Sequence, residues 1–230
     1  MKEIVSDLMR LASPEKAAIL SRFFRTGKGE YGEGDIFLGI TAPQQRKVAI
    51  KYRAASFDDL QQLLASNIHE YRLVALFILT EKYDKSDKTG RKDCVDFFLQ
   101  NLARVNSWDL VDLSSGRILG DYLLDRDKRI LYRLAVSENL WERRISIIST
   151  FSFIRKDRFD DTLKIAGILL NDRHDLIHKA VGWMLREIGK RDLAVEESFL
   201  KSHCRTMPRT MLRYAIERFD EKKRRFYLGK

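Results

Sequence analysis

A helical hydrophobic pattern that recurs along the chain is the feature that most limits how this sequence can fold. Residues 70–83 carry apolar side chains at the i, i+3, i+4, i+7 and i+8 positions of one helical face. Comparable segments begin near Leu140, Leu176 and Pro208, with starts 32 to 36 residues apart, and residue 70 lies about two such steps before Leu140. This interval is typical of a helix-pair repeat, so we predict an all-α solenoid of about six stacked helix pairs with one concave face.

Further segments between these helices are suited to be their partners in each pair. The expected partner helices cover residues 57–65, 88–104, 125–136, 159–170 and 193–202. The chain has only three prolines and no Ser/Gly/Pro-rich linker, and both facts favour uninterrupted helical packing. We therefore expect residues 1–230 to form a single domain.

The one conspicuous loop, residues 26–35, contains the letters of a dinucleotide-binding motif. Its GKGEYG sequence matches G-x-G-x-x-G, but that motif requires a preceding strand and a following helix that receives pyrophosphate. Here a helix is predicted before the loop, and Glu30, Glu33 and Asp35 would repel a phosphate. We interpret the segment as a connection between helices, and we expect no cofactor.

The chain is basic, with 43 Lys+Arg against 33 Asp+Glu and a formal net charge of +10. Ten basic and only three acidic residues lie between Lys201 and Lys230, so most of the surplus is C-terminal. A polyanion such as nucleic acid is the natural partner of such a surface. Charge alone does not distinguish a nucleic-acid-binding surface from a basic tail or from a surplus of charge that serves solubility.

Cysteine content and hydropathy are those expected of a cytoplasmic protein. Cys94 and Cys204 lie far apart and predict no disulfide framework, and the first residues do not resemble a signal peptide. These opening residues are amphipathic and interrupted by charges, so they predict a first helix. Because no apolar stretch approaches the roughly 20 residues that span a bilayer, we expect no membrane segment.

A zinc-like spacing of histidines is present in weak form. His174 and His178 stand four residues apart in HDLIH, which loosely echoes the H-E-x-x-H zinc helix. The acid between them is Asp, and no third ligand is evident. We interpret both histidines as solvated side chains near a helix start and predict no metal site.

The segment NSWDLVD combines an indole with two carboxylates. Asn106 or Ser107 can cap a helix, and Asp109 in its first turn suits the positive end of the helix dipole. Asp112 lies one turn beyond Trp108, so both side chains share a helix face. They are candidates for a substrate-contacting pair; the alternative is a core tryptophan beside a solvated or paired Asp112.

A second tryptophan projects away from the apolar face of its predicted helix. At about 100° per residue, the centre of the apolar stripe in residues 177–188 lies roughly 120° from Trp183. Lys179, Arg186 and Lys190 lie on the same side as the indole. This arrangement resembles a stacking platform in a basic groove more closely than core packing.

Arg144 interrupts an apolar stripe in the helix that begins near Leu140. A buried cation is costly unless it is paired. The pattern leaves two alternatives equally open. The guanidinium is either buried and paired, or it emerges near the helix start and holds an acid or a phosphate.

Together these residues resemble the AlkD-type DNA alkylation repair family, a group of HEAT-like repeat DNA glycosylases. The resemblance runs through most of the chain and is most specific in WDLVD at 108–112 and GWMLRE at 182–187. Supporting matches include PEKA, GEYGEGD followed by FLGI, NLWERR, and the late helix with Arg209 and Arg213. Position 107 is serine, where some relatives carry a second tryptophan, and this departure bears only on local packing.

The resemblance implies a HEAT-like solenoid with a basic concave face that clasps duplex DNA. It also implies a DNA glycosylase that excises positively charged N3- or N7-alkylated purines. By resemblance, Trp108, Asp112 and Trp183 match the catalytic cluster, and Arg144 matches the basic residue near the lesion. We expect a monomer whose further DNA contacts come from Lys179, Arg186, Arg209 and Arg213.

The implied chemistry suits these residue types. An alkylated purine is already positively charged and leaves without a general acid, so the site has to stabilise the sugar cation and place a water. A carboxylate can do both, and indoles can flank the charged nucleoside through cation–π contacts. No lysine is singled out as a nucleophile, so we expect no lyase step.

Two other functions stay open at this level. One is a non-catalytic HEAT-like nucleic-acid-binding protein, and the other is a protein–protein scaffold. A scaffold predicts no salt-sensitive DNA binding, whereas a basic groove predicts affinity that falls steeply as salt rises.

Overall fold

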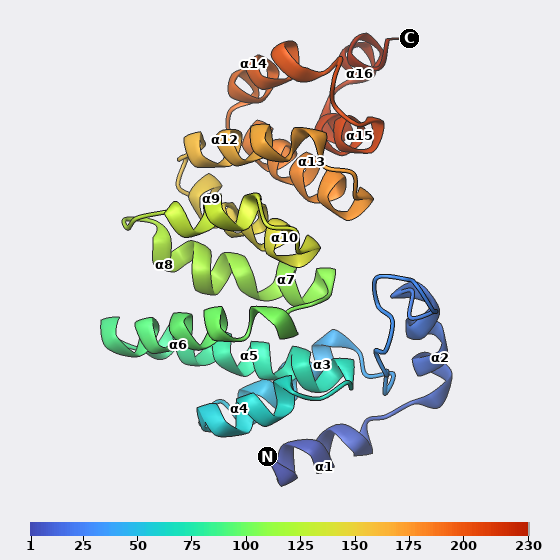
Figure 1. Ribbon diagram of the computed structural model, residues 1–230, viewed down its shortest axis with the longest axis vertical. Coiled ribbons are helices and arrows are strands. Elements are labelled where there is room, and N and C mark those ends of the chain that lie inside the picture. The colour runs from blue at the N-terminus through green and yellow to red at the C-terminus, as the bar shows by residue number, and fades with distance from the viewer. Residues whose placement is uncertain (230) are drawn as a thin grey trace. The chain divides into compact units, whose positions relative to one another are not determined.

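The computed structural model describes residues 1–229, and these residues form helices, turns and loops without a strand. One isolated bridge pairs Ile36 with Ile68. The all-α prediction is therefore confirmed for the described chain. Two compact units, Met1–Ser114 and Ser115–Lys230, divide the chain (Figure 1), and the single domain expected from the sequence stays a prediction.

The first unit is built from helices, three of which (residues 57–64, 69–85 and 88–100) begin close to where the sequence predicts them. Its helices are α1 (Lys2–Arg10), α2 (Pro14–Phe23), α3 (Ala42–Lys51), α4 (Phe57–Leu64), α5 (His69–Lys85), α6 (Lys88–Gln100) and α7 (Trp108–Ser115), whose last residue enters the second unit. The predicted 88–104 helix ends at Gln100 and is followed by a 3-10 turn.

Helix α5 is the core of the first unit. It packs against α3, α4 and α6, and the residues from His69 to Thr80 are all buried. This burial on every side explains why its apolar residues extend beyond a single stripe. The helix predicted over residues 70–83 is confirmed and is slightly longer at both ends.

The second unit continues the helical pattern. Its helices are α8 (Asp121–Leu123), α9 (Arg129–Ala135), α10 (Leu140–Ser149), α11 (Phe151–Ile154), α12 (Asp160–Ile168), α13 (Asp175–Gly189), α14 (Leu193–His203), α15 (Arg209–Ala215) and α16 (Glu221–Leu228). A π-helical segment precedes them at Gly116–Gly120.

Two predicted helices of this unit differ from the observed ones for local reasons. The 125–136 helix starts only at Arg129, because the Asp127 carboxylate accepts the Arg129 backbone N–H at 2.9 Å and forms a turn there. The long segment from Leu140 is divided at Thr150, whose hydroxyl donates to the Ile147 carbonyl. Such a bond from a hydroxyl competes with helical backbone pairing.

Helices at the predicted interval pack in succession within the second unit. Helix α13 contacts α10 and α15, whereas α9 and α12 pack beside α10. Gly182 permits the α13–α15 approach, because a Cβ atom there would lie 2.4 Å from the Met211 carbonyl oxygen. The repeat interval is thus found in this unit, while the complete solenoid and its concave basic face stay predictions. Within residues 1–229, no helix is long and apolar enough to cross a membrane.

Candidate functional site

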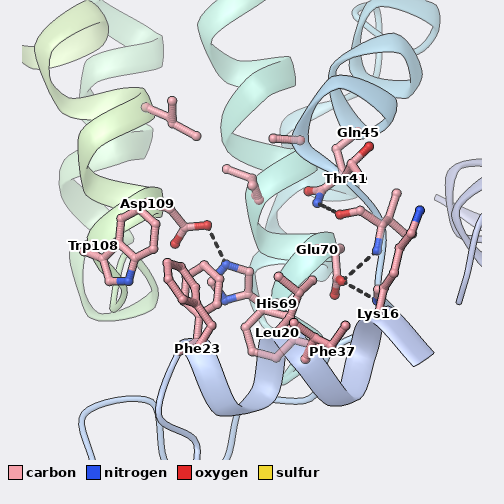
Figure 2. Close-up of a pocket in the computed structure, with 17 residues that line it drawn as sticks. Lys16, Leu20, Phe23, Phe37, Thr41, Gln45, His69, Glu70, Trp108 and Asp109 are labelled. Carbon is pink, nitrogen blue, oxygen red and sulfur yellow. Dashed lines mark hydrogen bonds and ion pairs between the residues drawn. The ribbon is translucent and has the colours of Figure 1, made fainter. Parts of the chain in front are cut away.

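A cavity of about 410 Å³ lies within the first unit, among α2, α3, α5, α7 and the segment of residues 37–42 (Figure 2). Its walls are almost entirely apolar. The aromatic part of the wall comes from Phe23, Phe24, Phe37 and Trp108. The cavity therefore offers aromatic surface beside one of the two tryptophans that the sequence singles out.

Trp108 is held by ring contacts at the start of α7. Its indole stacks on Phe24 with ring centroids 4.9 Å apart and an interplanar angle of 6°, and it meets Phe23 edge-on at 5.8 Å. The side chain is half-buried. Because offset stacking favours one ring orientation, Phe24, the residue that follows α2, fixes the indole at the edge of the cavity.

A buried charge network lies directly beneath this aromatic wall. His69 Nε2 is 2.8 Å from Asp109 Oδ2, and His69 Nδ1 is 3.0 Å from Asp35 Oδ2. The Arg72 guanidinium donates to the same Asp35 oxygen at 2.6 Å. The network joins the end of the 26–35 loop to α5 and α7, and Figure 2 shows the Asp109 end of it.

His69 is protonated at neutral pH. Burial alone would lower its pKa, but the hydrogen bond and charge of Asp109, with the hydrogen bond to Asp35, outweigh burial and raise the pKa to about 9. The pKa of Asp35 moves the other way: burial would raise it, but its bonds to His69 and Arg72 hold it below the usual range. The imidazolium thus pairs with a carboxylate on each side.

A second buried carboxylate shapes the cavity wall. The Glu70 side chain accepts backbone N–H bonds from Leu38, Gly39 and Ile40 at 2.8 to 3.2 Å. Gly39 has φ +83°, and a Cβ atom there would lie 2.2 Å from the Ser13 carbonyl oxygen. The turn can therefore press against the start of α2 only because glycine is present.

The structure gives Asp109 and Asp112 different surroundings. Asp109 is buried, and it lines the cavity together with Trp108 and Leu113. Asp112 is half-buried one turn after Trp108 on the same helix, as its spacing predicts. The helix dipole explains the position of Asp109 only in part, because its carboxylate also pairs with the His69 imidazolium.

Sequence reasoning missed the residues that hold this site together. His69, Glu70 and Arg72 all lie in the first turn of α5, directly before the apolar run of residues 73–79, and all three are buried. Three ionisable residues opening a hydrophobic helix were a signal in the sequence. The His69 partners Asp35 and Asp109 lie 34 and 40 residues away in the chain, so pattern analysis alone could not pair them.

Trp183 lies on α13 in the second unit, away from the packing face as predicted. The stripe of residues 177–188 is buried, whereas the indole is half-buried. Its Nε1 donates to Glu187 Oε1 at 2.9 Å, and its ring lies 5.9 Å from that of Phe151. A hydrogen bond and a ring contact therefore orient this indole.

The cations around Trp183 are paired with acids. Lys179 lies 2.7 Å from Asp175, and Lys190 lies 2.6 Å from Glu187. Arg186 pairs with Glu217 of the segment that follows α15. These acidic partners lower the net positive charge around the indole. The helical-wheel analysis of residues 177–188 counted the cations but not these acids.

The remaining predicted cations of the second unit differ in exposure. Arg144 is buried, and its Nη1 donates to the Leu176 carbonyl at the start of α13. This is the buried alternative that the sequence left open. Arg209 and Arg213 are exposed on α15, with Arg209 Nη2 donating to the Leu228 carbonyl at 3.1 Å.

His174 and His178 have structural partners at the start of α13. His174 is the N-cap of the helix, and its Nδ1 accepts the Leu176 backbone N–H at 3.1 Å. His178 Nε2 lies 2.5 Å from the Asp172 carbonyl oxygen. Among residues 1–229, no group of three or more His, Cys, Asp or Glu side chains could hold a metal ion.

The predicted site residues fall in both units. Trp108 and Asp112 share α7 in the first unit, whereas Arg144 and Trp183 belong to the second. The approach of Trp183 to Trp108 and Asp112 stays a prediction.

Comparison with known proteins gives one family and one fold. Residues 4–219 match the family model described as DNA alkylation repair enzyme. A solved structure, a predicted DNA alkylation repair enzyme from Enterococcus faecalis, is similar with a TM-score of 0.70 and 19% identity, over 91% of this chain and 97% of that one. At that identity the likeness concerns the fold alone. No curated protein matches the sequence.

Proposed function

The chain belongs to the DNA alkylation repair enzyme family, and on that premise we propose that it is a monofunctional DNA glycosylase. Its substrates are N3- and N7-alkylated purines in duplex DNA, whose positive charge makes them good leaving groups. The observation that carries the proposal is the family match over residues 4–219, which includes every residue assigned a role below.

The proposed reaction is hydrolysis of the N-glycosidic bond. The bond between C1′ and the purine nitrogen breaks, and its electron pair neutralises the cationic base. A water oxygen then bonds to C1′, and its proton leaves to solvent through Asp112. The Asp112 carboxylate also stabilises the positive charge that grows on the sugar.

Two indoles flank the cationic nucleoside in this proposal. Their ring faces attract the charge by about 0.5–2 kcal/mol each. Support comes from exposure and orientation: Trp108 and Trp183 are both half-buried, and each is held by ring contacts. The proposal requires both indoles and Asp112 to reach the same nucleotide.

DNA is held through its backbone in this proposal. The resemblance assigns Arg144 to the phosphate beside the lesion, a contact that requires its buried guanidinium to turn from the Leu176 carbonyl towards DNA. The remaining contacts follow a basic concave face of the solenoid. Exposure supports the roles of Arg209 and Arg213. The further assigned contacts are Lys179 and Arg186. The protein acts as a monomer and without a cofactor.

Base release from defined duplexes tests the proposal. Duplex DNA that contains N7-methylguanine or N3-methyladenine is incubated with the protein, and free base is measured by chromatography under single-turnover conditions. We expect release by the wild type and a loss of at least 100-fold with Asp112→Asn. Asp121→Asn, a substitution in the short helix α8, is the matched control and should retain the rate. Equal release by wild type and Asp112→Asn, or none by either, would contradict the proposal.

A non-catalytic duplex-binding protein is the second candidate. Salt-sensitive binding of duplex DNA without base release would favour it.

A further inference from the structure

The proposed excision chemistry gives no role to the cavity that Trp108 lines. Its volume of about 410 Å³ falls in the range of roughly 300–1,000 Å³ typical of small-molecule sites. Two wall residues, Ile19 and Phe23, are 66% and 62% exposed. The wall therefore reaches the surface, and a ligand has a route into the cavity.

The wall is suited to flat rings. Trp108 stacks on Phe24 with an interplanar angle of 6°, and Phe37 stacks on the His69 imidazole at 4.5 Å and 21°. Figure 2 shows Phe23, Phe37, His69 and Trp108 around the same space. Aromatic surfaces bind planar rings by offset stacking and edge contacts, whereas puckered aliphatic rings make fewer close contacts with them.

The backbone and imidazole donors of the wall are already engaged, as is one N–H of Gln45. The N–H groups of Gly39 and Ile40 donate to Glu70, and Gln45 Nε2 donates to the Ile40 carbonyl at 2.8 Å. Both His69 nitrogens are bonded to carboxylates. An anion in the cavity would lose its water without gaining these donors, and that loss is costly.

The buried charges around the cavity also oppose an anion. Asp35 and Asp109 pair with His69, and Asp35 also pairs with Arg72. The Glu70 carboxylate accepts backbone N–H groups instead, which leaves three carboxylates against two cations. Lys16 lines the cavity but is exposed, and in Figure 2 its ammonium points away from the aromatic residues. Solvent screens that ammonium far more than the buried groups.

We propose that this cavity is a binding site for a planar aromatic system of two or three fused rings that carries no negative charge. Shape and the absence of negative charge dominate selectivity, since the engaged backbone and imidazole donors cannot read a pattern of polar groups. Nucleotides are excluded by their phosphates. Free purines bind poorly, because their polar edges would lose water and find few open partners, such as Gln45 Oε1, in exchange.

A series of probes with one ring shape tests charge selectivity. Isothermal titration calorimetry at pH 8 measures binding of acridine, N-methylacridinium and acridine-9-carboxylate to the full chain. We expect the neutral and cationic rings to bind with one site each and the carboxylate to bind at least tenfold more weakly. Guanine should show no saturable binding at the same concentrations. Equal or tighter binding of the carboxylate, or no binding of any probe, would overturn the proposal.

Two substitutions place the bound ring in this cavity. Leu20→Trp adds volume from α2, and Ala42→Phe adds it from the start of α3 at an exposed position. Each should weaken acridine binding at least tenfold. Ile168→Trp, at an exposed position of α12, is the control and should leave it unchanged. Urea unfolding checks that each variant is folded, and Ala42→Phe decides the question if Leu20→Trp is not. Unchanged acridine binding by a folded cavity variant would refute the assignment.

The proposal is separable from excision. Asp112→Asn, which is expected to abolish base release, should bind acridine as the wild type does. Loss of ring binding in that variant would count against a site confined to this cavity.

Discussion

His69 Nε2 lies 2.8 Å from Asp109 Oδ2, which ties the first turn of α5 to the first turn of α7. Both side chains are buried, and Asp35 holds the other imidazole nitrogen at 3.0 Å. Trp108 precedes Asp109 in the chain, so this pair fixes the backbone from which the indole projects. The network thereby supports both the proposed catalytic cluster and the cavity wall.

Removing the charge of Asp109 should destabilise the protein. Asp109→Asn leaves the buried imidazolium with one carboxylate partner, and breaking a buried ion pair costs about 3–5 kcal/mol. We expect the free energy of unfolding, measured by urea denaturation at pH 7, to fall by about 3 kcal/mol. Asp96→Asn, which removes an exposed pair with Lys92, is the control. An equal loss of stability in both variants would mean that the His69–Asp109 pair stabilises the protein no more than an exposed pair does.

The stability conferred by His69 should depend on pH. Its pKa in the folded protein is about 9, against an ordinary value of 6.5. The contribution is therefore fully present below pH 6.5 and is lost as pH rises through 9. His69→Gln should be less stable than the wild type by about 3 kcal/mol at pH 6, with the difference shrinking towards pH 9.5. His203→Gln should retain the pH dependence of the wild type, and a pH-independent deficit in His69→Gln would refute the prediction.

Replacing a buried acid of the second unit should stabilise the folded protein. Glu196 is 1% exposed, its Oε1 has no hydrogen-bond partner, and burial with the charge of Glu197 raises its pKa to about 8. Stability from the neutral carboxyl is fully present below about pH 4.5 and is lost as pH rises through 8.

Glu196→Gln removes that loss. We expect it to raise the free energy of unfolding at pH 7 by about 2–3 kcal/mol, with no gain at pH 4.5. Glu221→Gln removes an exposed pair with Arg225 and should give no gain. Thermal unfolding across this pH range distinguishes the two, and a lower Tm for Glu196→Gln at pH 8 would contradict the assigned pKa.

Gly182 should tolerate no side chain. The Cβ atom of Gly182→Ala would lie 2.4 Å from the Met211 carbonyl oxygen and 2.5 Å from Tyr214 Cβ, so α13 and α15 must separate. We expect a loss of about 1–3 kcal/mol, as in other overpacked cores. Gly167→Ala in α12, where no atom lies within 4 Å, should instead add about 0.4–1 kcal/mol. Urea midpoints that move in the same direction for both variants would contradict the close approach.

DNA binding should carry a measurable salt signature. If Arg213 contacts a phosphate, Arg213→Gln should reduce the slope of log affinity against log salt by about 1. Fluorescence anisotropy with an unmodified duplex between 50 and 200 mM NaCl measures that slope. Arg129→Gln, which removes a cation that is 91% exposed and lies beside Asp127, is the control. An unchanged slope in Arg213→Gln would remove this residue from the interface.

The hydrophobic pattern predicted burial correctly where a helix buries a single face. The stripe of residues 177–188 and the off-face position of Trp183 follow from the helical period, and the structure buries the stripe as predicted. Helix ends were less predictable. The delayed start of α9 and the break at Thr150 depend on side-chain hydrogen bonds that hydrophobic periodicity does not include.

The sequence by itself determined an all-α chain, the helix-pair interval and the family motifs, because these depend on residues close together in the chain. Only the tertiary structure paired His69 with Asp35 and Asp109 and closed an aromatic cavity behind Trp108. Those contacts join residues 34 and 40 positions apart. A charge becomes energetically decisive only when packing removes its water, and that condition exists only in the folded chain.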